Sequence, residues 1–259
     1  MSLEVAREML AVEILRLRRN RVLMAFSALL AIGSLVLMFC FEAVQHASSP
    51  ATNAPAGGTV GFDHAVRMLG LMFGVLAAAL IGTEAGTADL SSGVFRDLVA
   101  TGRSRLALFA FRAPAAILVT LALDAVAFAI AIVATFLLAG GQPDPTLAVI
   151  LQSAAWIVLS TTMAATLAVG VGSVSGSRGV TLTGVLGWLA IATPLLINVS
   201  SLGSVREGIM TVALSSLMPV SGGLGASIAV PTAVAVAVLA GWLAVPTALG
   251  AWKTVTGDA

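Results

Sequence analysis

Residues 147–172 read LAVILQSAAWIVLSTTMAATLAVGVG and contain no charged side chain. About 20 apolar residues in a helix that rises ~1.5 Å per residue cross the ~30 Å hydrocarbon core of a bilayer. The stretch is therefore predicted to be a transmembrane helix. Similar stretches lie on both sides of it, so this segment indicates the fold class of most of the chain.

The composition of the whole chain agrees with a membrane protein. Of the 259 residues, 59% are hydrophobic and only 10% are charged, whereas a soluble chain carries about 25% charged residues. Charges and clusters of Gly, Pro and Ser bound the apolar stretches. We predict six transmembrane helices at residues 22–41, 68–83, 113–139, 147–172, 180–199 and 228–251. The fold is expected to be all-α, with a six-span transmembrane domain over 22–251 and a tail at 252–259.

The distribution of basic residues predicts the orientation of these spans. With the N-terminus inside, all of the 13 Lys and Arg residues except Arg67 and Arg206 fall on the same side. Cytoplasmic loops carry an excess of Lys and Arg. Both termini are therefore expected in the cytoplasm, with the chain in the cell (inner) membrane.

Residues 1–21 precede the first span and are predicted to form an interfacial amphipathic helix. Apolar residues recur there at steps of three and four, while Glu4, Arg7 and Arg18 lie towards the opposite side. The apolar stripe consists of Leu3, Ala6, Leu10, Ile14 and Leu17. An ordinary cytoplasmic tail with basic anchor residues is the alternative.

Three connecting segments differ from simple loops. Residues 42–67 are rich in Ala, Pro, Gly, Ser and Thr, and we expect a flexible outer tether. Residues 84–112 form a long charged cytoplasmic loop, in which 90–100 has the pattern of a short amphipathic helix. Within 200–227, the apolar run 208–217 is too short to cross a bilayer. We predict a re-entrant hairpin there, between the fifth and sixth spans, that enters the membrane from the outer side.

Several functions are excluded by the residues that are present. The only lysine, Lys253, follows Trp252 rather than a glycine, so the chain has no P-loop for ATP. The single cysteine, Cys40, cannot form an internal disulfide, and a net charge of +1 offers no basic surface for nucleic acid. We expect a transport protein rather than an enzyme, with no cofactor of its own.

The first outer segment carries side chains that are competent metal ligands. They are Cys40, Glu42, His46, Asp63 and His64. Their spacing matches no tight ligand pattern. Solvated loop residues with a membrane-embedded thiol are the favoured interpretation, and no metal site is predicted.

Two features inside the spans are candidates for helix packing or for a substrate pathway. Asp124 is an ionisable residue in the third span, where a functional role is the usual hypothesis; a protonated structural carboxyl is the alternative. In the second span, small residues recur every four positions and allow close helix approach. They are Gly70, Gly74, Ala78, Gly82 and Gly86. This ridge would pack either within the chain or at a seam between subunits.

The cytoplasmic loop contains the most informative motif. Residues 92–105 read SGVFRDLVATGRSR and follow the acidic Glu84. This stretch resembles a segment of export-type (type-2) ABC transporter permeases, in which an acidic residue precedes a Gly-Thr-Leu-like helix start, a leucine pair, a Thr-Pro or Thr-Gly turn and a Ser-Arg. The six spans, the N-terminal helix and the hairpin with its Pro219 extend the resemblance over nearly the whole chain.

The resemblance implies that this loop is a coupling helix that docks on a separate ATP-binding subunit. ATP and Mg would be held by that partner, and a second permease subunit, identical or homologous, would complete the transporter. The coupling residues would be Glu84, Gly93, Val94, Phe95, Arg96, Asp97 and Leu98. Phe95 would serve as an apolar knob between polar contacts. Val94, Val99 and Arg112 depart from the family pattern.

The expected function is that of the membrane-spanning permease subunit of an ATP-driven exporter. An apolar or amphiphilic substrate is favoured because few polar residues lie in or next to the last three spans. The obvious ones are Gln152, Thr161, Thr162, Thr166, Asn198 and Ser200. The alternative is a secondary transporter or channel-like protein that uses Asp124. A membrane enzyme is a third and weaker alternative.

Overall fold

The computed structural model describes residues 3–91, 104–220 and 228–256, and within these segments every regular element is a helix. The α-helices are α1 (Leu3–Arg19), α2 (Arg21–Ala28), α3 (Ser34–Ser48), α4 (Gly58–Arg67), α5 (Phe73–Ser91), α7 (Arg105–Leu137), α8 (Leu147–Ser175), α9 (Arg178–Gly187), α10 (Thr193–Ile197), α11 (Met210–Ser216) and α12 (Thr232–Thr256). Three π-helical turns, η1 (Leu29–Gly33), η2 (Met68–Met72) and η3 (Trp188–Ala192), continue helices, and η4 (Ser200–Gly208) is a 3₁₀ segment.

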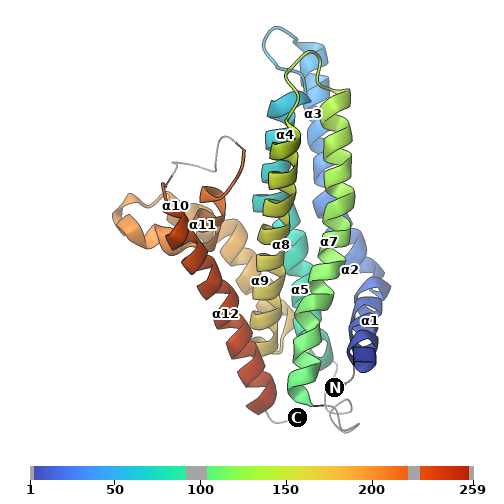
Figure 1. The fold of residues 1–259 in the computed structure, drawn as a ribbon, viewed down its shortest axis with the longest axis vertical. Helices are drawn as coiled ribbons and strands as arrows, with labels where there is room; N and C mark the ends of the chain where they lie inside the picture. Colours follow the sequence, from blue (N-terminus) through green and yellow to red (C-terminus); the bar gives the residue numbers. More distant parts are fainter. Residues whose placement is uncertain (1–2, 92–103, 221–227, 257–259) are drawn as a thin grey trace.

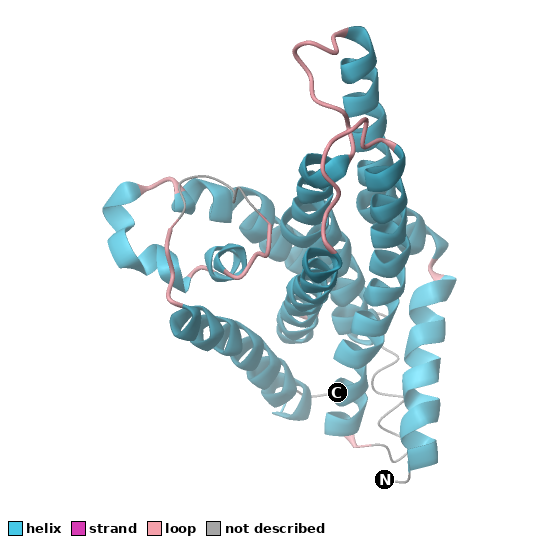
Figure 2. Cartoon of the chain, turned by 45° about the horizontal axis from the view of Figure 1, so that its top comes forward, coloured by secondary structure: helices cyan, strands magenta, loops and turns pink. Residues whose placement is uncertain are grey.

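Different helices begin and end at the two ends of the bundle (Figure 1). At the basal end, α1 and α7 begin and α12 ends, close to both chain termini. At the distal end, α3 ends and α4 begins. Figure 2 shows the same bundle tilted, with α10, α11 and η4 projecting to one side of the long helices. The terms basal and distal are used below in this sense.

Six helical stretches are long and apolar enough to cross a membrane, as the sequence predicted. They are Arg21–Ser48, Gly58–Asp89, Arg105–Leu137, Leu147–Ser175, Arg178–Ile197 and Thr232–Thr256. Most extend beyond the predicted apolar cores. The loop predicted at 84–112 is correspondingly shorter, because α5 continues to Ser91 and α7 begins at Arg105. Charged residues in these extensions pair with one another inside the bundle, so they do not end the helices.

The flexible tether predicted for residues 42–67 is wrong for most of its length. Helix α3 continues to Ser48 and α4 begins at Gly58, which leaves a short connection at 49–57. The Gly57 amide donates to the Leu138 carbonyl at 2.9 Å, and the Thr59 amide donates to the Pro143 carbonyl at 2.9 Å. The first bond ties the connection to the end of α7, and the second ties the start of α4 to the segment between α7 and α8. A composition rich in small and polar residues was therefore insufficient evidence for a disordered segment.

Helices α5 and α8 form the centre of the bundle. Within an apolar stretch of 18 residues in each span, 67% of the residues are buried in the span that contains α5 and 72% in that of α8, against 17% in α12. A Cβ on Gly82 would lie 2.3 Å from the Ala165 carbonyl oxygen, and one on Gly86 would lie 2.7 Å from that of Val169. The small residues of α5 thus let two backbones approach closely, which is how helices pack in lipid.

Two tryptophans hold the segment between the fifth and sixth spans. Trp156 of α8 donates its Nε1 proton to the Leu214 carbonyl of α11 at 2.8 Å. Trp242 of α12 donates to the Gly208 carbonyl at 2.9 Å and lies 5.7 Å, ring centre to ring centre, from Trp188. The predicted segment 200–227 therefore contains η4 and α11 packed against the spans, and its residues 221–227 lie outside the described part of the chain.

Candidate functional site

A buried ion pair connects the two helices on either side of residues 92–103. Arg112 of α7 is fully buried, and its Nη2 atom lies 3.5 Å from Oδ2 of Asp89, near the end of α5. The side chain of Arg16 on α1 binds the other carboxylate oxygen of Asp89. Ser104 caps α7 by accepting the Ala107 amide proton at 3.2 Å, which starts the helix close to its charged residues. Three helices thus converge on one carboxylate.

Arg112 also reaches the fourth helix at this end of the bundle. Its Nη1 donates to the Ser173 hydroxyl of α8 at 3.2 Å and to the Gly86 carbonyl of α5 at 3.4 Å. The Ser173 hydroxyl donates to the same carbonyl at 3.4 Å. Because Gly86 has no side chain, its backbone lies close enough to α8 to share these donors. The guanidinium therefore links α5, α7 and α8 around Asp89.

Glu13 extends the cluster along α1. Its Oε2 atom lies 2.7 Å from Nη2 of Arg16, one helical turn away. Burial raises the pKa of Glu13 above its ordinary value of 4.5; Arg16 opposes this shift, and the nearby Asp89 adds to it. The carboxyl is thus held in an environment that disfavours its charge. We refer to Glu13, Arg16, Asp89, Arg112 and Ser173 as the basal cluster.

A second junction lies beside it. Glu84 of α5 accepts a hydrogen bond from the Asn20 amide at 3.0 Å, and its other oxygen lies 3.3 Å from Nη1 of Arg178 at the start of α9. Asn20 also caps α2 by accepting the Leu23 amide proton at 3.1 Å. The Arg178 side chain is 48% exposed, so its ion pair contributes only ~0–1 kcal/mol. Glu84 nevertheless joins the turn between α1 and α2 to α5 and α9.

Among the ion pairs described here, the Asp89–Arg112 pair is expected to contribute most to the free energy of unfolding. Removing one partner of a buried ion pair costs about 3–5 kcal/mol, because an uncompensated charge stays in a medium of low polarity. Exposed pairs have no such penalty, because water solvates the remaining charge. The basal cluster therefore joins α1, α5, α7 and α8 through charged and polar contacts that are costly to break.

The predicted coupling residues are only partly within the described chain. Glu84 lies at the second junction described above. Gly93, Val94, Phe95, Arg96, Asp97 and Leu98 lie outside the described residues. Sequence reasoning missed Asp89 and Arg16, and it noted Arg112 only as a departure from the family pattern. A usable signal was present, because these charges stand where apolar stretches end.

The candidates predicted for packing or the substrate pathway do not gather at one place. Asp124 is 4% exposed on α7, and its two carboxylate oxygens have no hydrogen-bond partner among the described residues. Asn198 follows α10 and donates to the Pro194 carbonyl at 2.8 Å. Gly74 lies next to η2, and a Cβ on it would lie 2.3 Å from the Leu69 carbonyl oxygen of the same span. Gly82 packs on α8 as described. Asp124 is not among the residues that line the pocket containing Asn198 and Gly70.

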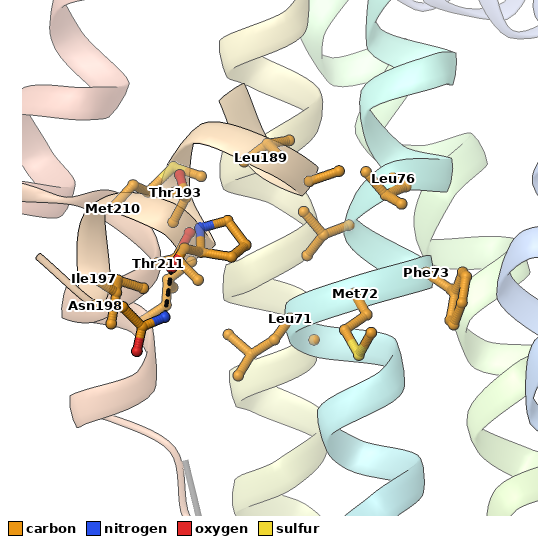
Figure 3. A pocket seen from close by; sticks show the side chains of 15 residues that line it. Leu71, Met72, Phe73, Leu76, Leu189, Thr193, Ile197, Asn198, Met210 and Thr211 are labelled. Carbon is orange, nitrogen blue, oxygen red and sulfur yellow. Dashed lines mark hydrogen bonds between the residues drawn. The ribbon is translucent and has the colours of Figure 1, made fainter. Parts of the chain in front are cut away.

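That pocket lies between α5, α11 and the end of the fifth span (Figure 3). Its volume is about 380 Å³, and its lining is formed mainly by aliphatic side chains and methionines. Leu71, Met72 and Leu76 come from the second span, and Leu189 and Ile197 from the fifth. Of the residues predicted as pathway candidates, Asn198 and Gly70 belong to this lining.

The candidate metal ligands do not assemble into a site. His64 Nδ1 lies 2.8 Å from the Glu42 carboxylate, and His46 Nδ1 lies 2.8 Å from the Asn53 carbonyl oxygen. Cys40 is exposed. Within residues 3–91, 104–220 and 228–256, no three His, Cys, Asp or Glu side chains are grouped so as to hold a metal ion. The pairing of His64 with Glu42 instead joins α4 to α3.

No family model matches the chain, and no curated protein matches it. The class that the fold defines is therefore an all-helical protein with six helices able to span a membrane.

Proposed function

We propose that this chain is the membrane-spanning permease subunit of an ATP-driven exporter. The basal end would face the cytoplasm, where the excess of Lys and Arg predicts it. A separate subunit would bind ATP and Mg, and a second permease chain would complete the transporter. The substrate would be apolar or amphiphilic. Two observations support this proposal: the family resemblance of residues 92–105, which is a feature of the sequence, and the basal cluster, which is a feature of the structure.

The observation that carries it is the buried attachment of both ends of residues 92–103. Asp89 precedes this segment and Arg112 follows it, and the two pair with each other inside the bundle. A docking segment can drive helices only if its ends are fixed to them. Here each end is fixed, and Arg16 and Ser173 pass the connection on to α1 and α8.

The proposed mechanism follows from these connections. When the nucleotide subunits close on ATP, they would push the segment between α5 and α7. The buried pair would move both helices together, and α8 would follow through Ser173. Helix α1 would lie at the interface of the cytoplasmic leaflet and would be connected to α5 through the pair of Arg16 with Asp89. The segment containing η4 and α11 would form the re-entrant hairpin that closes the outer side.

Co-purification tests the proposal directly. The affinity-tagged chain is isolated from gently solubilised native membranes, and accompanying soluble subunits are identified by mass spectrometry. We expect a partner with Walker motifs in near-equal amount. Its absence in several mild detergents would overturn the ATP-driven reading.

The buried Asp124 favours one alternative, a secondary carrier coupled to an ion gradient. In proteoliposomes without ATP, such a carrier would move substrate when a pH gradient is imposed, and Asp124→Asn would abolish that movement. The exporter predicts no movement without ATP. A variant in which Asp124→Asn leaves ATP-driven transport intact would assign this carboxyl a structural role.

A further inference from the structure

Three arginines at the turn between α1 and α2 have no role in the mechanism above. Arg18 and Arg19 end α1, and Arg21 begins α2 after Asn20. All three arginines are exposed, and none makes a hydrogen bond or ion pair through its side chain within the described residues. We refer to residues 18–21 as the basic turn.

The carboxylates that contact α1 or its turn are already engaged. Glu13 and Asp89 both pair with Arg16. Glu84 accepts a hydrogen bond from the Asn20 side chain and pairs with the start of α9. The basic turn therefore presents three positive charges without a paired counter-charge in the described part of the chain.

The basic turn lies where the first candidate span begins. This span covers Arg21–Ser48. Val22, Phe26 and Leu29 recur in it at steps of four and three, and they are 66%, 59% and 60% exposed. An exposed apolar stripe on a membrane-spanning helix is in contact with lipid tails, and basic residues at the end of the span lie at the level of the headgroups. The charges and the stripe are thus continuous along the chain.

The apolar stripe that the sequence predicted on α1 is covered by the protein. Leu17 is fully buried, and Leu10 and Ile14 pack on the same apolar cluster, which α5 and α7 complete. Most of this stripe is therefore not free to enter the membrane. The basic turn, by contrast, lies along one edge of the bundle, where α1 and α2 meet (Figures 1 and 2). It is the part of this helix pair that can contact headgroups.

We propose that the basic turn binds the headgroup of an anionic phospholipid, whose acyl chains lie along the exposed stripe of the first span. Guanidinium groups bind phosphate through paired hydrogen bonds, and each basic residue at an anionic membrane surface adds electrostatic attraction. Asn20 lies between the arginines and binds Glu84, so a bound lipid would hold α1 close to the basal cluster. The site rests on the six candidate spans alone and is independent of how transport is energised.

Lipid titration of the full-length chain tests this site. The purified protein in neutral detergent is titrated with phosphatidylglycerol and, separately, with phosphatidylcholine of the same acyl chains, and bound lipids are counted by native mass spectrometry. We expect the first phosphatidylglycerol to bind at least about tenfold more tightly, since each arginine near an anionic headgroup contributes about fivefold. Equal affinity for the two lipids would overturn the proposal. Full displacement of the lipid by glycerol 3-phosphate, which has no acyl chains, would also overturn it.

Matched variants separate the basic turn from general attraction between basic residues and anionic lipid. The triple variant Arg18→Gln, Arg19→Gln, Arg21→Gln should lose the preference for phosphatidylglycerol. The same three positions changed to Lys keep the charge and should retain most of the preference, which shows that the loss is not a failure to fold. Arg7→Gln with Lys253→Gln is the control, because it removes exposed basic residues outside the turn. An equal loss per charge in the control would rule out a site at the turn.

A soluble partner that docks on the same arginines is the competing outcome. The triple Gln variant is therefore also isolated from gently solubilised native membranes, and accompanying subunits are identified as for the native chain. Loss of the partner with an unchanged lipid preference would assign the arginines to that partner and overturn the lipid site. We expect the reverse, a lost lipid preference with an unchanged yield of the partner. Because the lipid titration uses the chain alone, its result does not depend on the exporter proposal.

Discussion

At the scale of single residues, Arg112 is the side chain with the largest expected effect on stability. Arg112→Met keeps most of the volume but leaves Asp89 buried beside Arg16 with one counter-charge fewer. Because Arg16 still pairs with Asp89, we expect a loss in the free energy of unfolding below the ~3–5 kcal/mol of a fully uncompensated buried charge, but above that of an exposed pair. Thermal unfolding in detergent measures it. Arg178→Met is the matched control, because its exposed pair should cost ~0–1 kcal/mol.

The double variant Asp89→Leu with Arg112→Met distinguishes a buried charge from lost packing. If the uncompensated carboxylate is the cause, removing it should recover much of the stability. A double variant as unstable as the sum of the single ones would mean that the two residues act through other contacts.

Glu13 gives the basal cluster a defined pH dependence. Burial raises the pKa of this carboxyl above 4.5, so the folded protein binds a proton there at pH values where the unfolded chain has lost it. Its contribution to stability is therefore full below pH 4.5 and is lost as the pH rises through the folded pKa. Glu13→Gln removes this loss, so the variant's stability relative to the native chain should increase from pH 4.5 towards neutral pH.

Melting temperatures of Glu13→Gln and the native chain across this pH range check the prediction. Glu8→Gln is the control, since Glu8 is exposed on the same helix. Other carboxylates titrate in both proteins, and their effects cancel in the difference. A difference that does not change with pH would contradict the role assigned to burial.

At the scale of elements, the contact of α5 with α8 decides whether the bundle can close. Gly82→Ala places a Cβ 2.3 Å from the Ala165 carbonyl oxygen, which forces two backbones apart. Overpacking of this kind costs about 1–3 kcal/mol. Gly184→Ala on α9 meets nothing within 4 Å and should stabilise its helix by ~0.5–1 kcal/mol. Thermal unfolding of the two variants checks these opposite effects on stability. Equal changes in melting temperature would contradict close packing of α5 against α8.

The helices themselves were predictable from sequence, because an uncharged apolar stretch of sufficient length has few alternatives in a chain this hydrophobic. Their ends were not. Asp89 and Arg16 are 73 positions apart, and only the fold reveals that they pair and allow α5 to continue past residue 83. The π turns also have no clear signature in the sequence. The pocket, which depends on two of them, was therefore missed, although Asn198 and Gly70 from its lining were singled out.

The small-residue ridge of the second span shows the same limit. The spacing of Gly70, Gly74 and Gly82 predicted a packed face but left its partner open. The structure places Gly70 against Trp156 and Gly82 against Ala165, both on α8. Spacing reveals a face of a helix, whereas the partner of that face depends on contacts between spans that lie far apart in the sequence.

At the scale of the whole molecule, the proposed exporter requires that movement enter through residues 92–103. We expect Phe95→Ala to lower transport per ATP hydrolysed by at least about tenfold, as for loss of a buried aromatic anchor at an interface. ATP hydrolysis by the partner subunit should continue, because its catalytic site lies in the other chain. The two rates are measured in proteoliposomes that contain the co-purified complex. Phe41→Ala is the control, since Phe41 is exposed on α3 at the distal end.

Gly93→Pro tests the same lever through the backbone, since proline would constrain the segment without removing a side chain. Both variants should uncouple in the same direction if residues 92–103 transmit force. Asp89→Asn is a third variant that tests this lever. It weakens the attachment of residues 92–103 to the bundle rather than the surface that docks on the partner. It should reduce coupling while leaving the partner bound, whereas Phe95→Ala should also weaken binding of the partner. Unchanged coupling in Phe95→Ala and Gly93→Pro would mean that this segment is not the lever.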